Sequence, residues 1–276
     1  MPDQLRIYCD SLARFVSLPK RPQRIISLVS SLTETIFETG HGERVVGVSS
    51  YCPRYVPNLT APIVGDYLFI NETKLAELQP DLVLMTTGVQ REVGRKLAEK
   101  GFPVFSLPLP NSLHGICENI VTLGGLMDEV DSARALADRI QRFFLGLQSD
   151  SPAPRKRIYA ECWFGKHPRA PGGLTFIHDI LTAAGGENIY GNERQGYLRL
   201  DLSETWRRKP DAMVLFTEPE YPVDAQALLN ERGWQGLPVI ESNITRGHNI
   251  IHDGPSIMET AAWLKRTLEE HPLHIA

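Results

Sequence analysis

The sequence repeats itself in a way that limits how it can fold. "QPDLVLMTT" at 79–87 and "KPDAMVLFT" at 209–217 both place Pro-Asp before an apolar run that ends in Thr. Two further echoes occur in the same order: Gly42-Glu43 returns as Gly186-Glu187, and "GFPV" at 101–104 returns as "GLPV" at 236–239. All three pairs are about 130 to 144 residues apart, which predicts two lobes of related topology.

The local patterns within each half favour an α/β class with parallel sheets. Short apolar runs such as "RIISLV", "DLVLMT", "RIYAEC" and "DAMVLF" alternate with amphipathic stretches that end at Gly or Pro. This alternation predicts strands joined by helices. "SLTETIFETG" after the first strand carries Ser31 and Glu34 at the spacing of a capping box. "LRIYCDSLARFVSLP" at the start predicts a small hairpin.

The stretch 129–148 predicts one long helix between the halves. It contains no Pro, and its apolar residues recur at the spacing of a single helical face. Asp128 is in place to cap its start. We therefore expect an N-terminal lobe at 1–127, a rigid helix and linker at 128–150, and a C-terminal lobe at 151–276, with a ligand in the cleft between the lobes.

Composition excludes several functional classes. The chain has 276 residues, 42% hydrophobic and 22% charged, and a net charge of -4, which fits a globular protein and gives no basic footprint for nucleic acid. Its four cysteines are scattered without a C-x-x-C pair, so neither a zinc site nor a dense disulfide framework is predicted. We expect a monomer.

The first twenty residues carry five charged side chains and no apolar signal core, and no apolar run reaches the eighteen or so residues that span a bilayer. The sequence as written therefore predicts no export, and it implies a cytoplasmic protein if Met1 is the native start.

At the residue level the chain resembles a known family along nearly its whole length. The matching stretches include "RIISLVSSLTETIFETGHGERVVGVSSYC", "LAELQPDLVL", "TFIHDILTAAGGENIY" and "KPDAMVLF". They are similar to the helical-backbone (class III) substrate-binding proteins of ABC importers for vitamin B12, haem and siderophores, and most similar to the vitamin B12 (cobalamin) branch. The resemblance implies two Rossmann-like lobes joined by a long helix, a periplasmic or otherwise extracytoplasmic location, and no enzymatic activity.

The same resemblance implies a corrinoid held by side chains at strand ends, with no other cofactor. Loop aromatics suit a flat, largely apolar corrin because they offer large contact area at low entropic cost. The residues carried over from the family pattern are Tyr51, Tyr67, Trp163, Tyr197, His248 and Asn249. Each aromatic could instead cover the core of its lobe. Ser30 and Ser31, at the first strand-to-helix turn, could meet a polar ligand edge or simply cap the helix.

Histidines leave a metal site as a conceivable alternative. His248 and His252 are four residues apart beside Asp253, and His167 follows Trp163 closely. Imidazole ligates cobalt, iron and zinc, but no Cys or Glu completes a recognised ligand set. The simpler reading is that His252 and Asp253 cap the helix beginning near Pro255.

The family resemblance also implies a permease partner, contacted by one acidic residue on the helix before each Pro-Asp strand. Glu204 fills this place in the second lobe. The first lobe has Thr73 and Lys74 at the matching positions, with Glu72 and Glu77 nearby, so we expect Glu72 and Glu204 as docking candidates.

Two rival functions remain open at this level. Haem or an anionic ferric siderophore could replace the corrinoid, and a siderophore would favour an arginine cluster. Its candidate members are Arg169, Arg194, Arg199 and Arg246. An α/β enzyme with an active site between the lobes is the rival from another class, although the sequence has no nucleophile elbow, P-loop or G-x-G-x-x-G turn.

Overall fold

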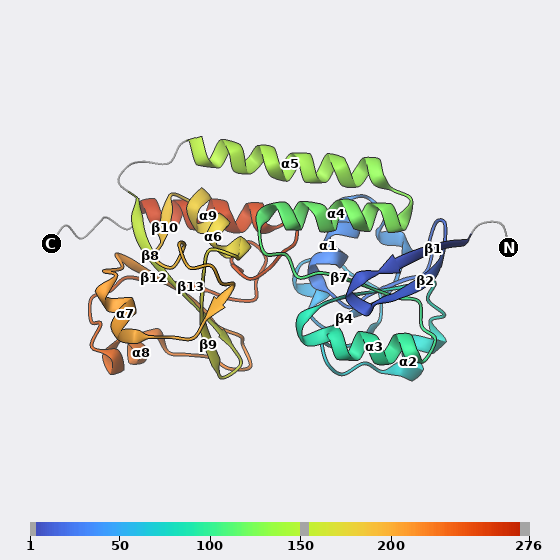
Figure 1. The fold of residues 1–276 in the computed structure, drawn as a ribbon, viewed down its shortest axis with the longest axis horizontal. Coiled ribbons are helices and arrows are strands. Elements are labelled where there is room, and N and C mark those ends of the chain that lie inside the picture. The colour runs from blue at the N-terminus through green and yellow to red at the C-terminus, as the bar shows by residue number, and fades with distance from the viewer. Residues whose placement is uncertain (1–3, 150–154, 271–276) are drawn as a thin grey trace. The chain divides into compact units, whose positions relative to one another are not determined.

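A computed structural model describes residues 4–149 and 155–270 (Figure 1). The chain divides into two compact units. The first holds the chain up to Pro110 together with Gly115–Ile140, and the second holds Asn111–His114 together with the chain from Gln141 onward. The division falls inside the long helix α5 (Val130–Ser149). The lobe boundaries expected from the sequence stay predictions.

The first unit is built on a five-stranded parallel sheet in the order β5-β4-β3-β6-β7. Its strands are β3 (Ile25–Ser27), β4 (Val45–Ser49), β5 (Ile63–Gly65), β6 (Leu82–Thr86) and β7 (Val104–Leu107). The helices that cover it are α1 (Ser30–Glu38), α2 (Glu72–Glu77), α3 (Arg91–Glu99) and α4 (Leu113–Met127). The α/β class with parallel sheets is confirmed.

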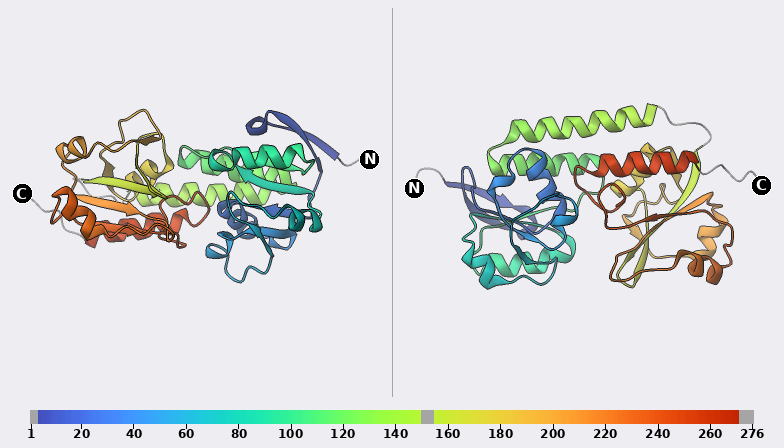
Figure 2. Two further views of the ribbon diagram at one scale, coloured as in Figure 1. Left: turned by 90° about the horizontal axis from the view of Figure 1, so that it is seen from below. Right: turned by 180° about the vertical axis from the view of Figure 1, so that it is seen from behind.

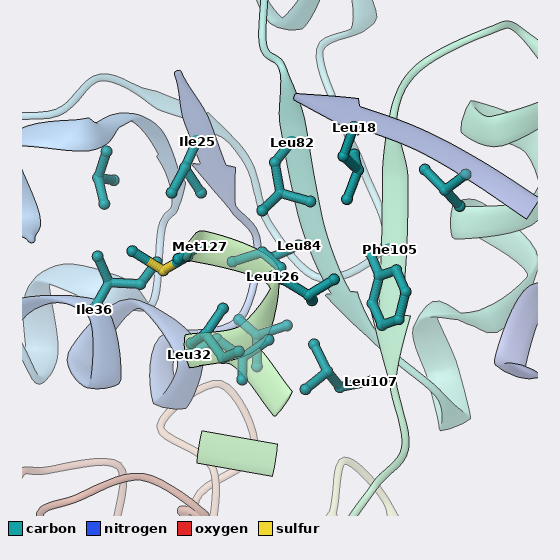
Figure 3. Close-up of a cluster of buried hydrophobic side chains, with 14 of the residues drawn as sticks. Leu18, Ile25, Leu32, Ile36, Leu82, Leu84, Phe105, Leu107, Leu126 and Met127 are labelled. Atoms are coloured by element: carbon teal, nitrogen blue, oxygen red, sulfur yellow. The ribbon is translucent and has the colours of Figure 1, made fainter. Parts of the chain in front are cut away.

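Successive residues of the central strands point to opposite faces, and each face has its own helices (Figures 1 and 2). Ile25, Leu82 and Leu84 pack with residues of α1 and α4, whereas Val83 and Met85 pack with α2 and α3. Figure 3 shows the first cluster, to which Leu126 and Met127 of α4 contribute. Burial on both faces explains why these strands are continuous apolar runs.

The predicted N-terminal hairpin is confirmed as β1 (Gln4–Cys9) and β2 (Arg14–Pro19), which pair in antiparallel fashion. Cys9, Val16 and Leu18 are buried in the first unit's core, and the Cys9 thiol contacts the backbone of Ser106 in β7. The hairpin is therefore attached to the edge strand of the first sheet.

The second unit has a mixed sheet in the order β11-β9-β8-β12-β13, with β10 also paired to β8. Its strands are β8 (Lys156–Phe164), β9 (His167–Pro171), β10 (Gly186–Asn188), β11 (Tyr197–Leu198), β12 (Ala212–Phe216) and β13 (Val239–Ser242). Its helices are α6 (Phe176–Ala183), α7 (Leu202–Arg207), α8 (Ala225–Arg232) and α9 (Ile257–Glu270). β8, β10, β12 and β13 are parallel, and β9 and β11 add an antiparallel edge.

The long helix predicted at 129–148 is confirmed as α5, with 20 residues. At 1.5 Å per residue it is about 30 Å long. Its buried stripe is formed by Ala133, Leu136, Ala137, Ile140 and Phe144. Within the first unit α5 approaches α4 closely, because a Cβ added to Gly124 would lie 2.3 Å from the Cβ of Ala133.

Two predicted helix caps are wrong. The helix α1 starts at Ser30, one residue before the expected cap, and Val29 precedes it without a side-chain hydrogen bond. Ser31 and Glu34 are consequently inside the helix and buried. Asp128 has a left-handed backbone (φ 60°) at the end of α4, and Glu129 separates it from the start of α5.

Candidate functional site

Two predicted aromatic residues of the first unit lie in contact. Tyr51 follows β4 and Tyr67 follows β5, and their ring centroids are 5.0 Å apart at an interplanar angle of 43°. β4 and β5 are parallel neighbours, so their carboxyl ends place both rings at one edge of the sheet. The hydroxyl of Ser30, at the start of α1, is 3.5 Å from the hydroxyl of Tyr67. The Arg54 guanidinium is 5.4 Å from the centroid of the Tyr51 ring.

The loop that presents Tyr67 is held by its own backbone. Gly65 has φ +155°, and a Cβ there would lie 2.3 Å from the carbonyl oxygen of Phe69. The Asp66 carboxylate accepts hydrogen bonds from the amides of Leu68 (2.7 Å) and Phe69 (2.8 Å). This tight turn leaves Phe69 77% exposed, beside a hollow that Val93 and Leu97 of α3 also line.

In the second unit Tyr197 contacts an aromatic residue that the sequence analysis missed. Its ring lies 5.4 Å from that of Phe164, nearly perpendicular at 86°, and Phe164 also packs against Phe216. Although the residue as a whole is 42% exposed, desolvation raises the pKa of Tyr197, and the charges of Cys162 and Asp253 raise it further. The second unit therefore has its own aromatic pair, Phe164 and Tyr197.

Trp163 does not join this pair, although it precedes Phe164 directly. Adjacent strand residues point to opposite faces, so Trp163 and Phe164 are on opposite sides of β8. Trp163 packs beside the core of Tyr159, Leu228 and other residues on the α8 side of the sheet. Its indole N–H donates to the Glu161 carboxylate at 2.7 Å. Its role as a ligand contact stays a prediction.

The Glu161 carboxylate, which accepts the hydrogen bond from the Trp163 indole, is fully buried. Glu161 also accepts a hydrogen bond from the Tyr159 hydroxyl (2.5 Å) and two from the Arg232 guanidinium (2.7 and 2.9 Å). Burial opposes the charge of Arg232, but the hydrogen bonds and the charge of Glu161 outweigh it and raise the pKa of the guanidinium. Burial, strengthened by the charge of Glu161, raises the pKa of Tyr159.

The two predicted residues of the loop before α9 have intramolecular contacts. The His248 ring packs edge-on against Trp263 of α9, with centroids 4.8 Å apart. Asn249 is 3% exposed, and its side-chain oxygen accepts a hydrogen bond from the amide of Ile251. Ser242 links this loop to β13, since its hydroxyl donates to the His248 carbonyl at 2.8 Å. The loop is thus ordered by its own contacts, and ligand contact by His248 and Asn249 stays a prediction.

The predicted docking acids occupy different positions in their helices. Asn71 caps α2 through the amide of Lys74, and Asp201 caps α7 through the amide of Glu204. The matching caps make Lys74 the structural counterpart of Glu204, whereas Glu72 is two residues earlier and forms an ion pair with Lys100. The two units therefore present opposite charges at equivalent positions.

Glu204 is itself paired within its unit. Its carboxylate contacts Arg207 and accepts a hydrogen bond from Arg208 at 2.7 Å. The Arg208 hydrogen bond is the main cause that lowers the pKa of Glu204. Arg208 also bonds Glu193 and the Ile189 carbonyl, so it joins α7 to the preceding loop.

Some of the cationic side chains that could serve an anionic siderophore have other partners. Arg246 forms an ion pair with Glu259 at 2.7 Å, and Arg169 donates to the carbonyl of its neighbour Pro168. In the described ranges 4–149 and 155–270 no three His, Cys, Asp or Glu residues are grouped so that they could hold a metal ion. All four cysteines are buried, and none of them forms a disulfide. No helix in the described part is long and apolar enough to cross a membrane.

The fold, with its two α/β units, is that of periplasmic binding proteins. The model of the periplasmic binding protein family matches residues 25–244, and the chain belongs to this family. Family members are extracytoplasmic solute-binding proteins that work with ABC transporters. The family resemblance seen in the sequence is confirmed.

Among curated relatives, a cobalamin-binding protein of Halobacterium salinarum is 29% identical over 208 residues, which is 72% of this chain and 55% of that protein. The chain thus spans about half the length of this relative. A vitamin B12-binding protein of Yersinia pestis is 26% identical over 209 residues, which is 74% of this chain and 73% of that protein.

Solved structures share the fold at low identity. A periplasmic vitamin B12 binding protein of Vibrio cholerae is 20% identical with a TM-score of 0.67, covering 92% of this chain and all of that one (100%). A periplasmic heme-binding protein of Roseiflexus is 18% identical with a TM-score of 0.72, covering 89% of this chain and 99% of that one. At these identities the likeness establishes the fold, and the ligand must be argued from the residues.

Proposed function

We propose that the chain reversibly binds a corrinoid of the vitamin B12 type, as the substrate-binding component of an ABC importer or as a binding and delivery homologue. The observation that carries this proposal is the pair of aromatic contacts, Tyr51 with Tyr67 and Phe164 with Tyr197. Each pair includes a residue at the carboxyl end of a sheet strand, which is where α/β proteins bind ligands. The cobalamin-binding relatives support the choice of ligand.

The chemistry of these pairs fits a corrin better than a small anion. Aromatic rings offer broad apolar contact, and the tyrosine hydroxyls can meet the amide groups at the rim of the macrocycle. A siderophore rich in negative charge would need free guanidinium groups, and Arg246 already pairs with Glu259. Haem remains the rival with a similar flat surface.

The direct test is to pass the purified protein through a gel-filtration column with cobalamin, haem or a ferric siderophore and to measure which absorbance co-elutes. We expect cobalamin to co-elute. Co-elution of haem or the siderophore without cobalamin would contradict the corrinoid proposal and leave a binding protein of the same family. Turnover of an ester, phosphate or nucleotide substrate would instead support an enzyme.

Single substitutions test whether the aromatic pairs contact the ligand. Tyr67→Ala and Tyr197→Ala should each weaken cobalamin binding about tenfold, because each removes a large apolar contact. Tyr8→Ala is the matched control: Tyr8 forms an equivalent pair with Phe15, at 5.1 Å, on the β1–β2 hairpin. Equal losses in all three variants would show that the pairs affect stability and not binding.

A membrane permease is the partner we propose, contacted through Glu204 and Glu72. Glu204 is held by Arg207 and Arg208, and a permease arginine could replace the more exposed Arg207. Glu204→Lys and Glu72→Lys should weaken association with the reconstituted transporter, whereas the exposed Glu77→Lys should not. If Glu204→Lys weakens association with the transporter and Glu72→Lys does not, Glu72 is not the residue through which the first unit docks.

A further inference from the structure

Glu161 is a buried acid with no place in the ligand proposal as stated. It lies in the middle of the second unit's sheet, on β8, with none of its side chain exposed. Its partner Arg232 is the last residue of α8, and that side chain is 7% exposed. A charge is rarely buried without complete pairing, because desolvation is costly. The use of this pair is therefore a question that the structure raises.

Each oxygen of the Glu161 carboxylate accepts two hydrogen bonds. One oxygen accepts hydrogen bonds from the Trp163 indole (2.7 Å) and Arg232 (2.9 Å), and the other accepts from the Tyr159 hydroxyl (2.5 Å) and Arg232 (2.7 Å). Two parallel N–H···O bonds from one guanidinium fix the plane of the carboxylate. Because that plane is fixed, the direction of the Trp163 N–H is fixed as well.

Arg232 is anchored by its place at the end of α8. Gly233 follows with a left-handed backbone, φ 70°, which ends the helix there. The guanidinium lies 5.3 Å from the centroid of the Trp234 ring. The orientation of the Trp163 indole is thus set by a helix end through a charged pair, and not by packing alone.

We propose that Glu161 and Arg232 are positioning residues for Trp163: they engage its indole N–H and leave only the ring surface for contact with a molecule bound at the carboxyl end of β8, where Trp163 and Phe164 are the last two residues. This rests on the proposed function. Its consequence for specificity is that Trp163 selects for a flat apolar surface on the ligand and contributes nothing to recognition of a hydrogen-bond acceptor. The indole is also ordered before binding, which removes part of the entropic cost of association.

The first measurement needs no ligand. Indole N–H signals of the four tryptophans are recorded by 15N NMR on the full chain, and Trp163→Phe assigns the signal of Trp163. We expect the Trp163 N–H to exchange slowly with water in the wild type and quickly in Glu161→Leu/Arg232→Met, which removes both charges together. Arg232→Lys, which keeps the charge but loses the two parallel bonds, should be intermediate. Fast exchange in the wild type would overturn the proposal.

The second measurement is a mutant cycle in which the affinity for cobalamin is compared with and without the Glu161–Arg232 pair. Removing the pair by Glu161→Leu/Arg232→Met should weaken binding about fivefold when residue 163 is Trp, and less than about twofold in the Trp163→Phe background. Equal losses in both backgrounds would overturn the positioning role, because a merely structural effect does not depend on residue 163. If the double variant does not fold, Arg232→Lys completes the cycle.

The two proposals fail differently. Absence of cobalamin binding by the wild type would contradict the proposed function, while slow exchange of the Trp163 N–H would still support the ordering of the indole. Normal cobalamin binding with fast exchange would contradict the positioning role alone.

Discussion

Asp81 and Asp211 form corresponding hydrogen bonds to the neighbouring strand in the two units. The Asp81 carboxylate accepts from the amides of Gln23 and Arg24, and the Asp211 carboxylate accepts from the amide of Arg157 at 2.7 Å. In return the amide of Asp81 donates to the Arg24 carbonyl, and that of Asp211 to the Arg157 carbonyl. Each Asp therefore joins the start of its own strand to the start of the neighbouring one.

The two arginines complete the correspondence. The Arg24 side chain donates to the carbonyls of Leu78 and Gln79, and the Arg157 side chain donates to those of Arg208 and Lys209. In both units the residue before Pro has a left-handed backbone, φ 45° at Gln79 and φ 48° at Lys209. The arginines thus satisfy the first two carbonyls that follow α2 and α7, at the ends where a helix leaves its carbonyls without intrahelical partners.

This arrangement predicts a stability cost for removing either carboxylate. Asp81→Ala should lower the free energy of unfolding by about 1–2 kcal/mol, because two backbone amides lose a charged acceptor. Urea unfolding at neutral pH measures the change. The control is Glu77→Ala, which removes an exposed carboxylate at the end of α2 and should change the free energy of unfolding by less than about 0.5 kcal/mol. A similar loss in both variants would contradict the bridging role of Asp81.

The repeat itself could be predicted from sequence because it consists of local signals. Pro-Asp before an apolar run, Gly after a helix and a stripe of one helical face are short-range patterns, and each has its counterpart in the structure. The helix α4 was missed for the opposite reason. Its buried residues form one half of the helix, but the exposed half consists of His114, Glu118, Thr122 and Gly125 and has only one Asp, Glu, Lys or Arg side chain, Glu118, so the contrast in hydropathy between the two halves is weak.

The antiparallel edge of the second sheet could not be predicted from the sequence either. β11 has only two residues, Tyr197 and Leu198, and is defined by its pairing with β9. Such a strand has no local pattern. The site was predictable only in part for a related reason: strand alternation separates Trp163 from Phe164, but the sequence does not say which of them shares a face with Tyr197.

A second prediction concerns the charges at the start of α5. Glu129 is bound by the buried Arg44, by Arg21 at 2.6 Å and by His41 at 3.3 Å. The Arg44 hydrogen bond is the main cause that lowers the pKa of Glu129. Because the folded-state pKa is depressed, this stabilisation is complete above the ordinary glutamate pKa of about 4.3 and is lost as the pH falls through the lower folded-state value.

Glu129→Gln should therefore reduce the free energy of unfolding by about 2–3 kcal/mol at pH 7, because it leaves the buried Arg44 with only the more distant and exposed carboxylate of Glu43 at 3.7 Å. The difference from the wild type should shrink as urea unfolding is repeated at successively lower pH. Glu77→Gln serves as the control, with no change expected at pH 7. A constant difference from neutral to acid pH would show that the ionised carboxylate is not the source of the stability.

Tyrosine titration provides a third prediction. Burial raises the pKa of Tyr159, Tyr190 and Tyr197. These three should stay neutral while the absorbance change near the ordinary tyrosine pKa of about 10 develops. The folded state favours the neutral phenols, so this contribution to stability is present below pH of about 10 and is lost as the pH rises further.

Ultraviolet absorbance at alkaline pH counts the tyrosinates in the folded protein, and the urea-unfolded chain should titrate all eight tyrosines together. Tyr197→Phe should leave the amplitude near pH of about 10 unchanged in the folded protein. A drop by one tyrosine's amplitude would mean that the Tyr197 hydroxyl is hydrated and that its pKa is not raised by desolvation.

The two arginines beside Glu204 offer a matched comparison on one helix. Arg208 is 25% exposed and also binds Glu193, the Ile189 carbonyl and the Tyr190 ring, whereas Arg207 is 75% exposed and forms an ion pair with Glu204. Surface ion pairs contribute little, and partly buried arginines with several acceptors contribute more. Arg208→Met should lower the free energy of unfolding by about 2 kcal/mol and Arg207→Met by less than about 0.5 kcal/mol.

Chemical denaturation of the two variants separates these roles, and the pKa of Glu204 gives a second reading. Losing the Arg208 hydrogen bond should raise that pKa toward the ordinary glutamate value, since this bond is the main cause of its depression. Losing Arg207 should raise it less. If the Arg207 variant shows the larger change in either measurement, Glu204 is held mainly from the solvent side, and a permease could displace that arginine only at a greater cost.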